Sequence, residues 1–321
     1  MTWLSDKVLA HLCQVADWPD LTGTRYELID KIGQGGMGTV FRAHDRELDR
    51  AVAIKVLSAA PDQAQAKARM EREARITARL EHPSIVPVHD SGVLPDGRFF
   101  YAMKLVRGQR LDQPEAIPVA LAERLQWFQR ICEAVAFAHA HGVIHRDLKP
   151  QNIMRGAFGE VLVLDWGLAQ IAQQRGEEGR ETLAEPPGTI AGTPGYMAPE
   201  QARGEIGEVD ERADVYALGA ILCFLVTGKA PGPGPVAVHA LPRPIQAICR
   251  KALARDRDQR YAAASELGAD VAAYLAGQRV AAYPEGYLGT ALRLGTKYRV
   301  VLGLISAYLV MRILLLVFAG P

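Results

Sequence analysis

Residues 145–152 read His-Arg-Asp-Leu-Lys-Pro-Gln-Asn, and this stretch indicates the fold more specifically than any other part of the chain. It places a carboxylate (Asp147), an ammonium group (Lys149) and an amide (Asn152) on one short loop. Asp147 can accept or orient the proton of a substrate hydroxyl, Asn152 can coordinate a divalent metal, and Lys149 can neutralise charge on a moving phosphoryl group. A chance surface loop is not expected to carry all three groups, so the stretch predicts a phosphoryl-transfer site.

Downstream of this loop, Asp165-Trp166-Gly167 follows the apolar run 161–164. A carboxylate at the end of a buried strand is a good Mg²⁺ ligand, because this ion prefers hard oxygen donors. Gly167 lets the chain turn away. Three further features follow, each of which alone is an ordinary turn, helix start or surface arginine: Gly192-Thr193-Pro194-Gly195-Tyr196-Met197-Ala198-Pro199-Glu200, Asp214-Val215-Tyr216-Ala217-Leu218-Gly219 and Arg260.

Upstream, Val52-Ala53-Ile54-Lys55 ends an apolar strand in a lysine. Such a lysine is usually a snorkelling surface residue. Its position after a glycine-rich segment favours a second interpretation, in which the cation grips the α- and β-phosphates and is oriented by a glutamate on the next helix. Glu73 and Glu71 are the candidates. We prefer Glu73 because it lies nine residues before His82, although either could simply lie on a solvated helix face.

The glycine-rich segment itself is Gly33-Gln34-Gly35-Gly36-Met37-Gly38, followed by Thr39 and Val40. A lone GxGxxG is a weak signal, and in dinucleotide-binding folds it opens a helix. Here a strand follows, which favours a flap whose backbone N–H groups cover phosphates. Taken alone, an ordinary glycine hairpin explains the segment equally well.

Together these motifs resemble those of the bacterial serine/threonine kinases of the eukaryotic protein-kinase superfamily, over residues 25–277. The order and rough spacing of the set are far more specific than any single motif. The resemblance implies an α+β bilobal fold, with a small β-rich N-lobe, a larger helical C-lobe, and ATP with Mg²⁺ (or Mn²⁺) in the cleft between them. It implies transfer of the ATP γ-phosphoryl group to Ser and Thr hydroxyls of proteins.

The resemblance also implies roles for single residues. Asp147 becomes the catalytic base with Lys149 beside it, Lys55 the phosphate lysine with Glu73 as its partner, and Asn152 and Asp165 the metal ligands. The nucleotide would be bound by Ile32, Gly33, Gln34, Gly35, Gly36, Met37, Gly38, Thr39, Val40, Ala53, Lys55, Met103, Leu105, Val106 and Met154. Within that set Met103 lies at the back of the adenine pocket, residues 104–106 form the hinge, and Val40, Ala53 and Met154 sandwich the adenine.

The family pattern further implies that Glu200 pairs with Arg260 and that Asp214 holds the catalytic loop from below. Lys149 and Thr193 match the serine/threonine branch. Thr182 and Thr189, in an expected loop over 173–190, are candidates for a phosphate that Arg146 could hold. That loop could also work without a phosphate, with Glu185 supplying a weaker negative charge.

The chain departs from the family pattern in three places. Trp166 stands where a phenylalanine is usual, Lys104 replaces an acidic hinge residue, and the proline- and glycine-rich segment 228–248 is shorter than usual and poorly suited to the helix that helps to dock substrates. These departures keep one alternative open, a nucleotide-binding pseudokinase that acts as a scaffold. The complete set Lys55, Asp147, Asn152 and Asp165 argues against it.

Composition sets wider bounds. The 321 residues carry a formal net charge of +1, which gives no reason to expect nucleic acid as a partner. Four scattered cysteines, without a CxxC pair, argue against a zinc site or disulfide framework and fit a reducing cytoplasm. The pattern predicts a helical extension over 1–24, strands over 26–57, a helix over 64–80, strands over 85–88 and 99–106, and short strands at 153–154 and 161–164.

The C-terminal end predicts a juxtamembrane linker over 278–299 and a transmembrane helix over 300–320. Arg312 costs roughly 2.5–3.5 kcal/mol on the insertion scale, whereas the thirteen Leu, Ile, Val and Phe residues return about 4–8 kcal/mol. Arg293, Lys297 and Arg299 precede the run and predict a single-pass protein with its kinase domain in the cytoplasm. The alternative is an apolar helix docked on the kinase or on a partner.

Overall fold

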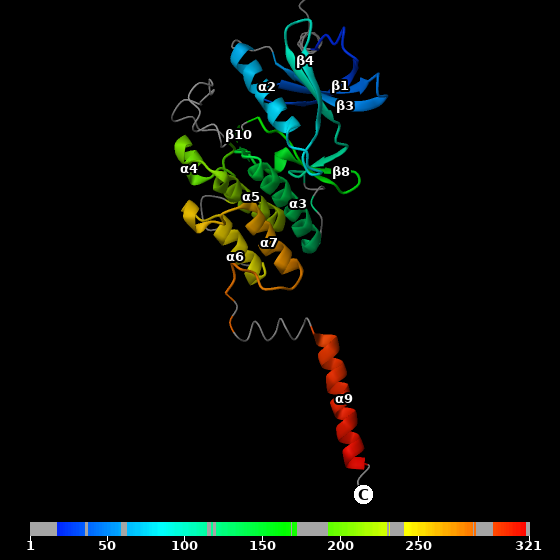
Figure 1. The fold of residues 1–321 in the computed structure, drawn as a ribbon, viewed down its shortest axis with the longest axis vertical. Helices are drawn as coiled ribbons and strands as arrows, with labels where there is room; N and C mark the ends of the chain where they lie inside the picture. Colours follow the sequence, from blue (N-terminus) through cyan, green and yellow to red (C-terminus); the bar gives the residue numbers. More distant parts are fainter. Residues whose placement is uncertain are drawn as a thin grey trace, which may run out of the picture.

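The computed structural model describes residues 18–35, 38–58, 63–113, 117, 120–167, 169–171, 192–229, 231, 241–284, 286 and 298–318. These residues form a β-sheet flanked by a helix, a helical part below it, and one separate C-terminal helix (Figure 1). Most of the predicted 1–24 helix and the expected loop over 173–190, with Thr182 and Thr189, lie outside the described residues. Residues 18–24, which are described, form turns.

The N-lobe is built on a five-stranded antiparallel sheet of order β1-β2-β3-β5-β4. Its strands are β1 (Tyr26–Gln34), β2 (Gly38–Asp45), β3 (Arg50–Leu57), β4 (Val88–Val93) and β5 (Phe99–Lys104). The strands predicted over 26–57 are therefore confirmed. The strand predicted over 85–88 is wrong, since β4 begins only at Val88. Pro87 lacks the N–H that a ladder needs, and Ile85 makes only an isolated bridge to Val163.

Helix α2 (Gln63–Ala78) covers one face of this sheet and also reaches the helical part (Figure 1). Met70 and Ala74 pack with Leu57 and Tyr101 of the sheet. Ile76, six residues after Met70, belongs to the hydrophobic core of the C-lobe. Helix α2 therefore packs against both lobes, through Met70 and Ala74 on the sheet and through Ile76 on the C-lobe core.

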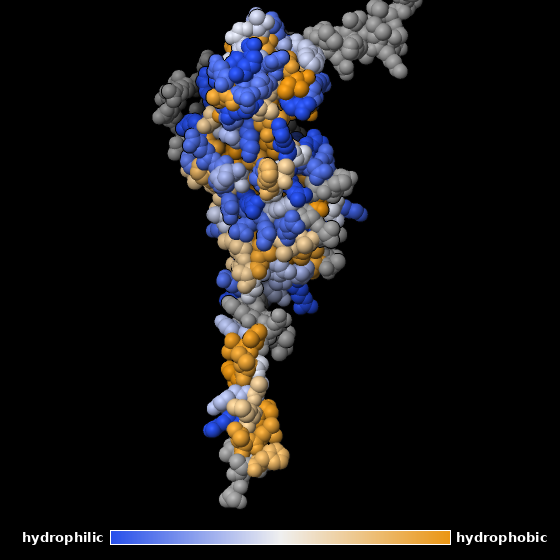
Figure 2. Space-filling model, turned by 90° about the vertical axis from the view of Figure 1, so that its right-hand side faces the viewer, coloured by the Kyte–Doolittle hydropathy of each residue, from blue (hydrophilic) through white to orange (hydrophobic). Residues whose placement is uncertain are grey.

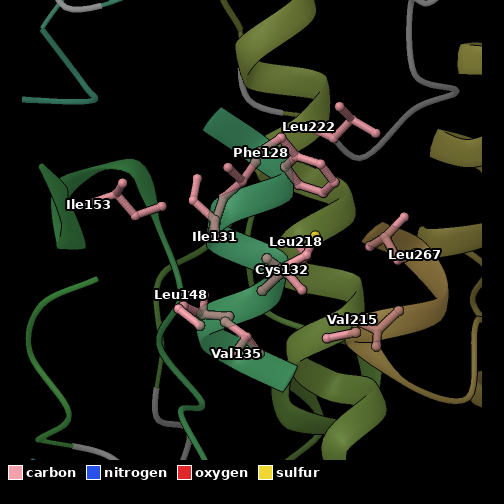
Figure 3. Packing of buried hydrophobic residues seen from close by; sticks show 14 of the residues in the cluster. Phe128, Ile131, Cys132, Val135, Leu148, Ile153, Val215, Leu218, Leu222 and Leu267 are labelled. Carbon is pink, nitrogen blue, oxygen red and sulfur yellow. The ribbon is translucent and has the colours of Figure 1, made fainter. Parts of the chain in front are cut away.

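The C-lobe is a helical domain whose core is made by α3, α5, α6 and α7. The helices are α3 (Leu121–Ala140), α4 (Pro199–Ala202), α5 (Glu211–Thr227), α6 (Arg243–Ala252) and α7 (Ala264–Leu275), with the 3-10 turns η2 (Pro150–Asn152), η4 (Ile206–Glu208) and η5 (Arg257–Gln259). Figure 3 shows Phe128 of α3 on the side of α5, which carries Leu218 and Leu222, and Ile131 on the side of Ile153; all of them belong to one buried cluster. This core is the platform on which the loop 145–152 rests.

Short strands cover the top of the C-lobe where it meets the sheet. They are β6 (Gly108–Arg110), β7 (Val143–Ile144), β8 (Ile153–Gly156), β9 (Val161–Val163) and β10 (Gln170–Ile171). The β8 and β9 strands confirm the predictions at 153–154 and 161–164. The loop 145–152 lies between β7 and β8, and Asp165 follows β9, so both motifs emerge at the boundary between the lobes.

The docking helix that is not expected in the segment 228–248 falls mostly on residues outside the described part of the chain, so that prediction stays open. Helix α5 ends at Thr227 against Gly228, whose φ of 76° suits glycine. Residues 232–240 lie outside the described part, but α6 already begins at Arg243, so the last quarter of the segment is helical. Pro244 is tolerated because it occupies the first turn, where its missing N–H would have no helical partner.

Helix α9 (Arg299–Phe318) is the helical part of the C-terminal run. Its large apolar side chains from Val300 to Leu315, and Phe318, are exposed, and Figure 2 shows the helix as a largely apolar column below a mostly hydrophilic domain. Among the described residues, no helix has the length and apolarity needed to cross a membrane. The transmembrane helix predicted over 300–320 is therefore not confirmed.

Candidate active site

The upper half of the site is a buried ion pair between β3 and α2. Lys55 Nζ lies 2.6 Å from Glu73 Oε1, as the sequence predicted, whereas Glu71 faces Lys67 and Arg75 on the helix surface. Tyr101 of β5 donates its hydroxyl to the same Oε1, also at 2.6 Å. Lys55 and Tyr101 are direct partners in the β3–β5 register, so both side chains leave the same face of the sheet toward α2.

Burial dominates the electrostatics of Glu73, which is 1% exposed. Burial raises the pKa of Glu73, and the ammonium group of Lys55 opposes that rise. Burial also lowers the pKa of Lys55, but the charges of Glu73 and Asp165 outweigh it, so the net shift is upward. No described group donates to Glu73 Oε2. The carboxylate is thus held through a single oxygen.

Asp165 brings the chain after β9 to the same cluster. Its Oδ1 lies 3.3 Å from Lys55 Nζ, and its backbone has a φ of 57°, which is unusual for a residue other than glycine. Burial raises its pKa, but the ammonium group of Lys55, together with the nearby His145, outweighs burial and holds the pKa below the ordinary value. Gly167 packs closely here: a Cβ would lie 3.2 Å from both Asp165 Oδ1 and Glu73 Oε2, so these side chains would have to shift by a few tenths of an ångström.

The lower half of the site surrounds Asp147. Lys149 Nζ donates to Asp147 Oδ2 at 2.7 Å and to Thr193 Oγ1 at 2.9 Å, and Thr193 Oγ1 donates to Asp147 Oδ1 at 2.9 Å. The amide nitrogen of Asn152 donates to the backbone oxygen of Asp147 at 2.9 Å. The three groups of the loop therefore converge as the sequence predicted, and Thr193, from a segment 46 residues away, joins them.

Asp214, at the start of α5, holds this loop from below. Its Oδ2 accepts from the backbone N–H of His145 at 2.7 Å and contacts His139 Nε2 at 2.9 Å, and its Oδ1 accepts from the Arg146 N–H at 2.8 Å. Burial raises the pKa of Asp214, but the hydrogen bond with His139 and the nearby charges and backbone donors outweigh it, so the pKa is lowered. These bonds hold Arg146 at a φ of 69°, a strained conformation for a side-chain-bearing residue.

A second buried pair fixes the segment after Thr193. Arg260 donates to both oxygens of Glu200, at 2.7 and 2.8 Å. Burial raises the pKa of Glu200, but the hydrogen bonds from Arg260 outweigh it and lower the pKa. The neighbouring Gln201 donates to the backbone oxygen of Arg146 at 3.0 Å. The pair expected from the sequence is present, and it is tied to the catalytic loop.

The residues predicted to contact the nucleotide belong mainly to the strands of the N-lobe sheet, apart from Gly36 and Met37, which lie outside the described residues. The Gly35 N–H donates to the Gly38 oxygen at 2.8 Å, so the glycine-rich segment turns between β1 and β2 rather than opening a helix. The remaining positions are Ile32, Gly33 and Gln34 on β1, Thr39 and Val40 on β2, Ala53 on β3, Met103 at the β5 position paired with Ala53, Leu105 and Val106 after β5, and Met154 on β8.

Two contacts in the site escaped the sequence analysis. In the sequence Tyr101 resembles an ordinary core residue. A signal was nevertheless present, because Tyr101 lies two residues before Met103 and therefore on the same face of β5. His139 reads as one of many helix positions. Trp166, noted as a departure, is fully buried with its ring centroid 4.5 Å from that of His145.

Comparison with known proteins identifies this arrangement. The family model described as "Protein kinase domain" matches residues 26–272. The chain belongs to the protein kinase family. The bilobal fold predicted from the sequence is thereby confirmed, and the two halves of the site lie where the β-rich and helical lobes of the kinase meet.

The relatives of the kinase are bacterial serine/threonine-protein kinases, as the motifs predicted. It is 36% identical over 301 residues to PknD of Chlamydia muridarum, a match that covers 79% of this chain and 32% of the relative. It is 39% identical over 279 residues to PknB of Mycolicibacterium smegmatis, covering 79% of this chain and 43% of the relative. The chain thus spans less than half the length of these relatives.

Solved structures agree with this assignment. The PknI kinase domain of Mycobacterium tuberculosis superposes with a TM-score of 0.58 and 28% identity, over 77% of this chain and 95% of that domain. The match concerns the kinase domain alone.

Proposed function

We propose that this kinase transfers the γ-phosphoryl group of ATP to serine and threonine hydroxyls of proteins. The observation that carries the proposal is the convergence of Lys149 and Thr193 on the two carboxylate oxygens of Asp147. Both contacts place donors against Asp147, which keeps the carboxylate oriented and polarised. A substrate hydroxyl that reaches this carboxylate can give up its proton as its oxygen attacks phosphorus.

Each neighbour of Asp147 has a distinct task in the proposed reaction. Asp147 accepts the hydroxyl proton, and Lys149 stabilises the negative charge that gathers on the transferred phosphoryl group. Thr193 links the base to the segment that a protein substrate would contact. The anchoring of His145 and Arg146 by Asp214 keeps this constellation in place before any substrate arrives.

The residues present fit a divalent metal of the Mg²⁺ type. Asp165 offers a half-exposed carboxylate, and the amide nitrogen of Asn152 is engaged by Asp147, which leaves the amide oxygen as a ligand. An all-oxygen pair of this kind suits Mg²⁺, which usually completes its shell with waters and phosphate oxygens. When bound, the metal would neutralise and orient the phosphates.

Lys55 would complete the phosphate site from above. Its ammonium group lies between Glu73 and Asp165, so it faces the position where metal-bound phosphates would enter. The backbone turn at Gly35 and Gly38 would close over the same phosphates. Ala53 and Met103 would form the wall against which the adenine ring packs.

The test is an assay of the full chain with γ-labelled ATP and Mg²⁺ on a Ser/Thr-containing protein, followed by identification of the phosphoamino acid. We expect phosphoserine or phosphothreonine from the wild type, and none from Lys55→Met. The matched control is Asp49→Asn, which neutralises an exposed turn carboxylate and should retain full activity. Nucleotide binding without transfer would overturn the proposal in favour of a pseudokinase scaffold.

We further propose that α9 attaches the kinase to a membrane, with the kinase domain on the cytoplasmic side. The support is the exposure of apolar side chains around the whole helix, including Leu304, Ile305, Val310 and Leu315. A helix that is apolar all round, with Arg312 as its one charge after the first residue, has no polar face to present to water. Lipid satisfies such a surface without a specific partner.

Membrane attachment is tested by floating the full chain with phospholipid vesicles, beside a chain that ends at Ala291. We expect the full chain to float and the shorter one to remain in solution with the same turnover on a soluble peptide. Alkaline carbonate washing then separates a helix that inserts from one that only adheres. A full chain that stays soluble without detergent or vesicles would contradict the proposal.

A further inference from the structure

The hydroxyl of Tyr101 has no part in the roles assigned so far, yet it binds Glu73, the partner of the proposed phosphate lysine Lys55. Tyr101 is 4% exposed and donates to Glu73 Oε1 at 2.6 Å, the same distance as the Lys55 contact. Burial, reinforced by the nearby Glu73 charge, raises the pKa of Tyr101 well above the ordinary value, so the hydroxyl stays protonated and remains a donor.

The register of the sheet explains why this contact is mechanically firm. Tyr101 is the direct partner of Lys55 between β3 and β5, and both strands are interior members of the sheet. The ring of Tyr101 also packs with Leu57, Met70 and Ala74, so the hydroxyl cannot swing away from α2. Glu73 thus accepts hydrogen bonds from Lys55 and Tyr101, which are neighbours on the same face of the sheet.

The two donors differ in what else they must do. The ammonium group of Lys55 has three donors, and it already contacts Asp165 as well as Glu73. In the proposed reaction it must also reach phosphate oxygens. The phenol has a single donor, and its recorded hydrogen bond is to Glu73. When Lys55 turns toward the phosphates, the Tyr101 bond still holds the glutamate.

Because Glu73 Oε2 has no donor among the described residues, loss of the phenol would leave this buried carboxylate with Lys55 alone. A buried charge with too few partners is costly, and the available relief is an outward movement of α2 that hydrates it. Such a movement would separate Glu73 from Lys55 and weaken phosphate binding.

We propose that Tyr101 is a positioning residue for ATP: its hydroxyl keeps Glu73 against Lys55 while Lys55 binds the phosphates. The inference rests on the proposed function, in which Lys55 binds ATP. Tyr101 touches neither ATP nor the reacting hydroxyl and acts only through Glu73.

The decisive variant is Tyr101→Phe in the full chain, which keeps the ring and removes only the hydroxyl. We expect calorimetry with Mg·ATP to show about tenfold weaker affinity, as befits a lost hydrogen bond to a charged group. In steady-state assays the KM for ATP should rise about as much, while the KM for a peptide substrate stays unchanged. A partly unfolded variant would instead lose active enzyme without a shift in either KM.

Tyr261→Phe is the matched control. Tyr261 is also buried and donates to a carboxylate, Asp270 Oδ2, at 2.8 Å, but it lies in the C-lobe core away from the phosphate site. This variant should lower thermal stability and leave ATP affinity at the wild-type value. An equal loss of ATP affinity in both variants would overturn the inference.

A double-mutant cycle with Glu73→Gln shows whether Tyr101 acts through Glu73. In the Glu73→Gln background, Tyr101→Phe should change ATP affinity by less than about twofold, because the two substitutions act on one contact. A full tenfold loss in that background, or no loss in the wild-type background, would refute the role. If the wild type binds ATP with the expected pattern but transfers no phosphate, the catalytic proposal fails and the role of Tyr101 stands.

Discussion

Two buried carboxylates, Asp214 below the catalytic loop and Glu73 above it, are equally hidden from solvent at 1% exposure each. Asp214 receives donors on both oxygens, from His139, His145 and Arg146, and its pKa is lowered. Glu73 receives both of its donors on one oxygen, and burial raises its pKa. Equal burial therefore produces opposite electrostatic results, because the number and placement of donors differ.

The difference separates a permanent part of the site from a conditional one. The saturated network around Asp214 fixes Asp147 as part of the folded C-lobe. The half-satisfied Glu73 fixes Lys55 only as long as α2 stays against the sheet. A metal–nucleotide complex that bound Lys55 would favour this arrangement, because the pair with Glu73 holds the ammonium group in place. The proposed base is thus held by the fold itself, whereas we expect the proposed phosphate site to become firmer when its ligand binds.

Asp147→Asn should break the lower region at its reacting group and gives the largest expected effect. The amide cannot accept the hydroxyl proton, so phosphoryl transfer should fall by about a hundredfold to ten-thousandfold. ATP affinity should remain at the wild-type value, because Asp147 acts on the hydroxyl. Turnover and calorimetry measured on the same preparation test this, and normal turnover would refute the assigned base.

Asp214→Asn should break the lower region at its anchor. An amide presents an N–H toward backbone donors, so at least one buried donor loses its acceptor. We expect the free energy of unfolding to fall by about 2–5 kcal/mol, as measured by denaturant titration. The corresponding change in the upper region, Glu73→Gln, should cost clearly less stability but more ATP affinity. Equal stability losses would remove the contrast between the two regions.

Gly167→Ala tests the upper region by crowding the oxygen of Glu73 that has no hydrogen bond. The added methyl would lie 3.2 Å from Glu73 Oε2. It would push the Glu73 side chain, which is hydrogen-bonded only through Oε1. ATP affinity should weaken about tenfold, the effect of one charged hydrogen bond. Gly207→Ala is the control, because a Cβ there meets no described atom within 4 Å. Unchanged affinity in Gly167→Ala would show that α2 is held more firmly than we infer.

The pH dependence of stability should have opposite signs for two glutamates. The pKa of Glu200 is lowered, so its stabilisation is present above its ordinary value of 4.5 and is lost as the pH falls through its folded value. The pKa of Glu73 is raised, so its stabilisation is present below 4.5 and is lost as the pH rises through its folded value. Glu200→Gln should therefore lower stability more at pH 7 than at pH 4. Glu73→Gln should lower stability less at pH 7 than at pH 4. Parallel trends in thermal melts would contradict this.

Trp166→Phe should give the smallest effect. The indole Nε1 of Trp166 is buried without a hydrogen-bond partner among the described residues, and the smaller ring removes that cost. The same change leaves a small cavity in the core, so the two contributions oppose each other. We expect the free energy of unfolding to change by less than about 1 kcal/mol, with turnover retained. A large loss of turnover would give the indole a role in the active arrangement.

The sequence predicted best what is local. Asp147, Lys149 and Asn152 lie within six residues, so the loop itself brings them together. The helix 64–80 was predictable because its composition lacks breakers, and the choice of Glu73 over Glu71 as the residue nearer Lys55 followed from spacing. These predictions concern one loop and one helix, whose shapes are determined by residues close together in the sequence.

What the sequence did not predict depends on packing between distant elements. The Tyr101–Glu73 bond requires the β3–β5 register and the placement of α2 on the sheet, and His139 meets Asp214 only because α3 packs on α5. The strand expected over 85–88 failed for a local reason, since Pro87 delays ladder formation until Val88. Tertiary contacts of this kind leave no periodic signal in one sequence.

Hydrogen–deuterium exchange of the full chain, with and without Mg·ATP, tests the contrast between permanent and conditional regions most directly. The account predicts that the amides of His145 and Arg146, bonded to Asp214, are strongly protected in both conditions. The amides of α2 around Glu73 should exchange faster without nucleotide and gain protection when it binds. Equal protection of α2 in both conditions, or catalytic-loop amides that become protected only with nucleotide, would contradict it.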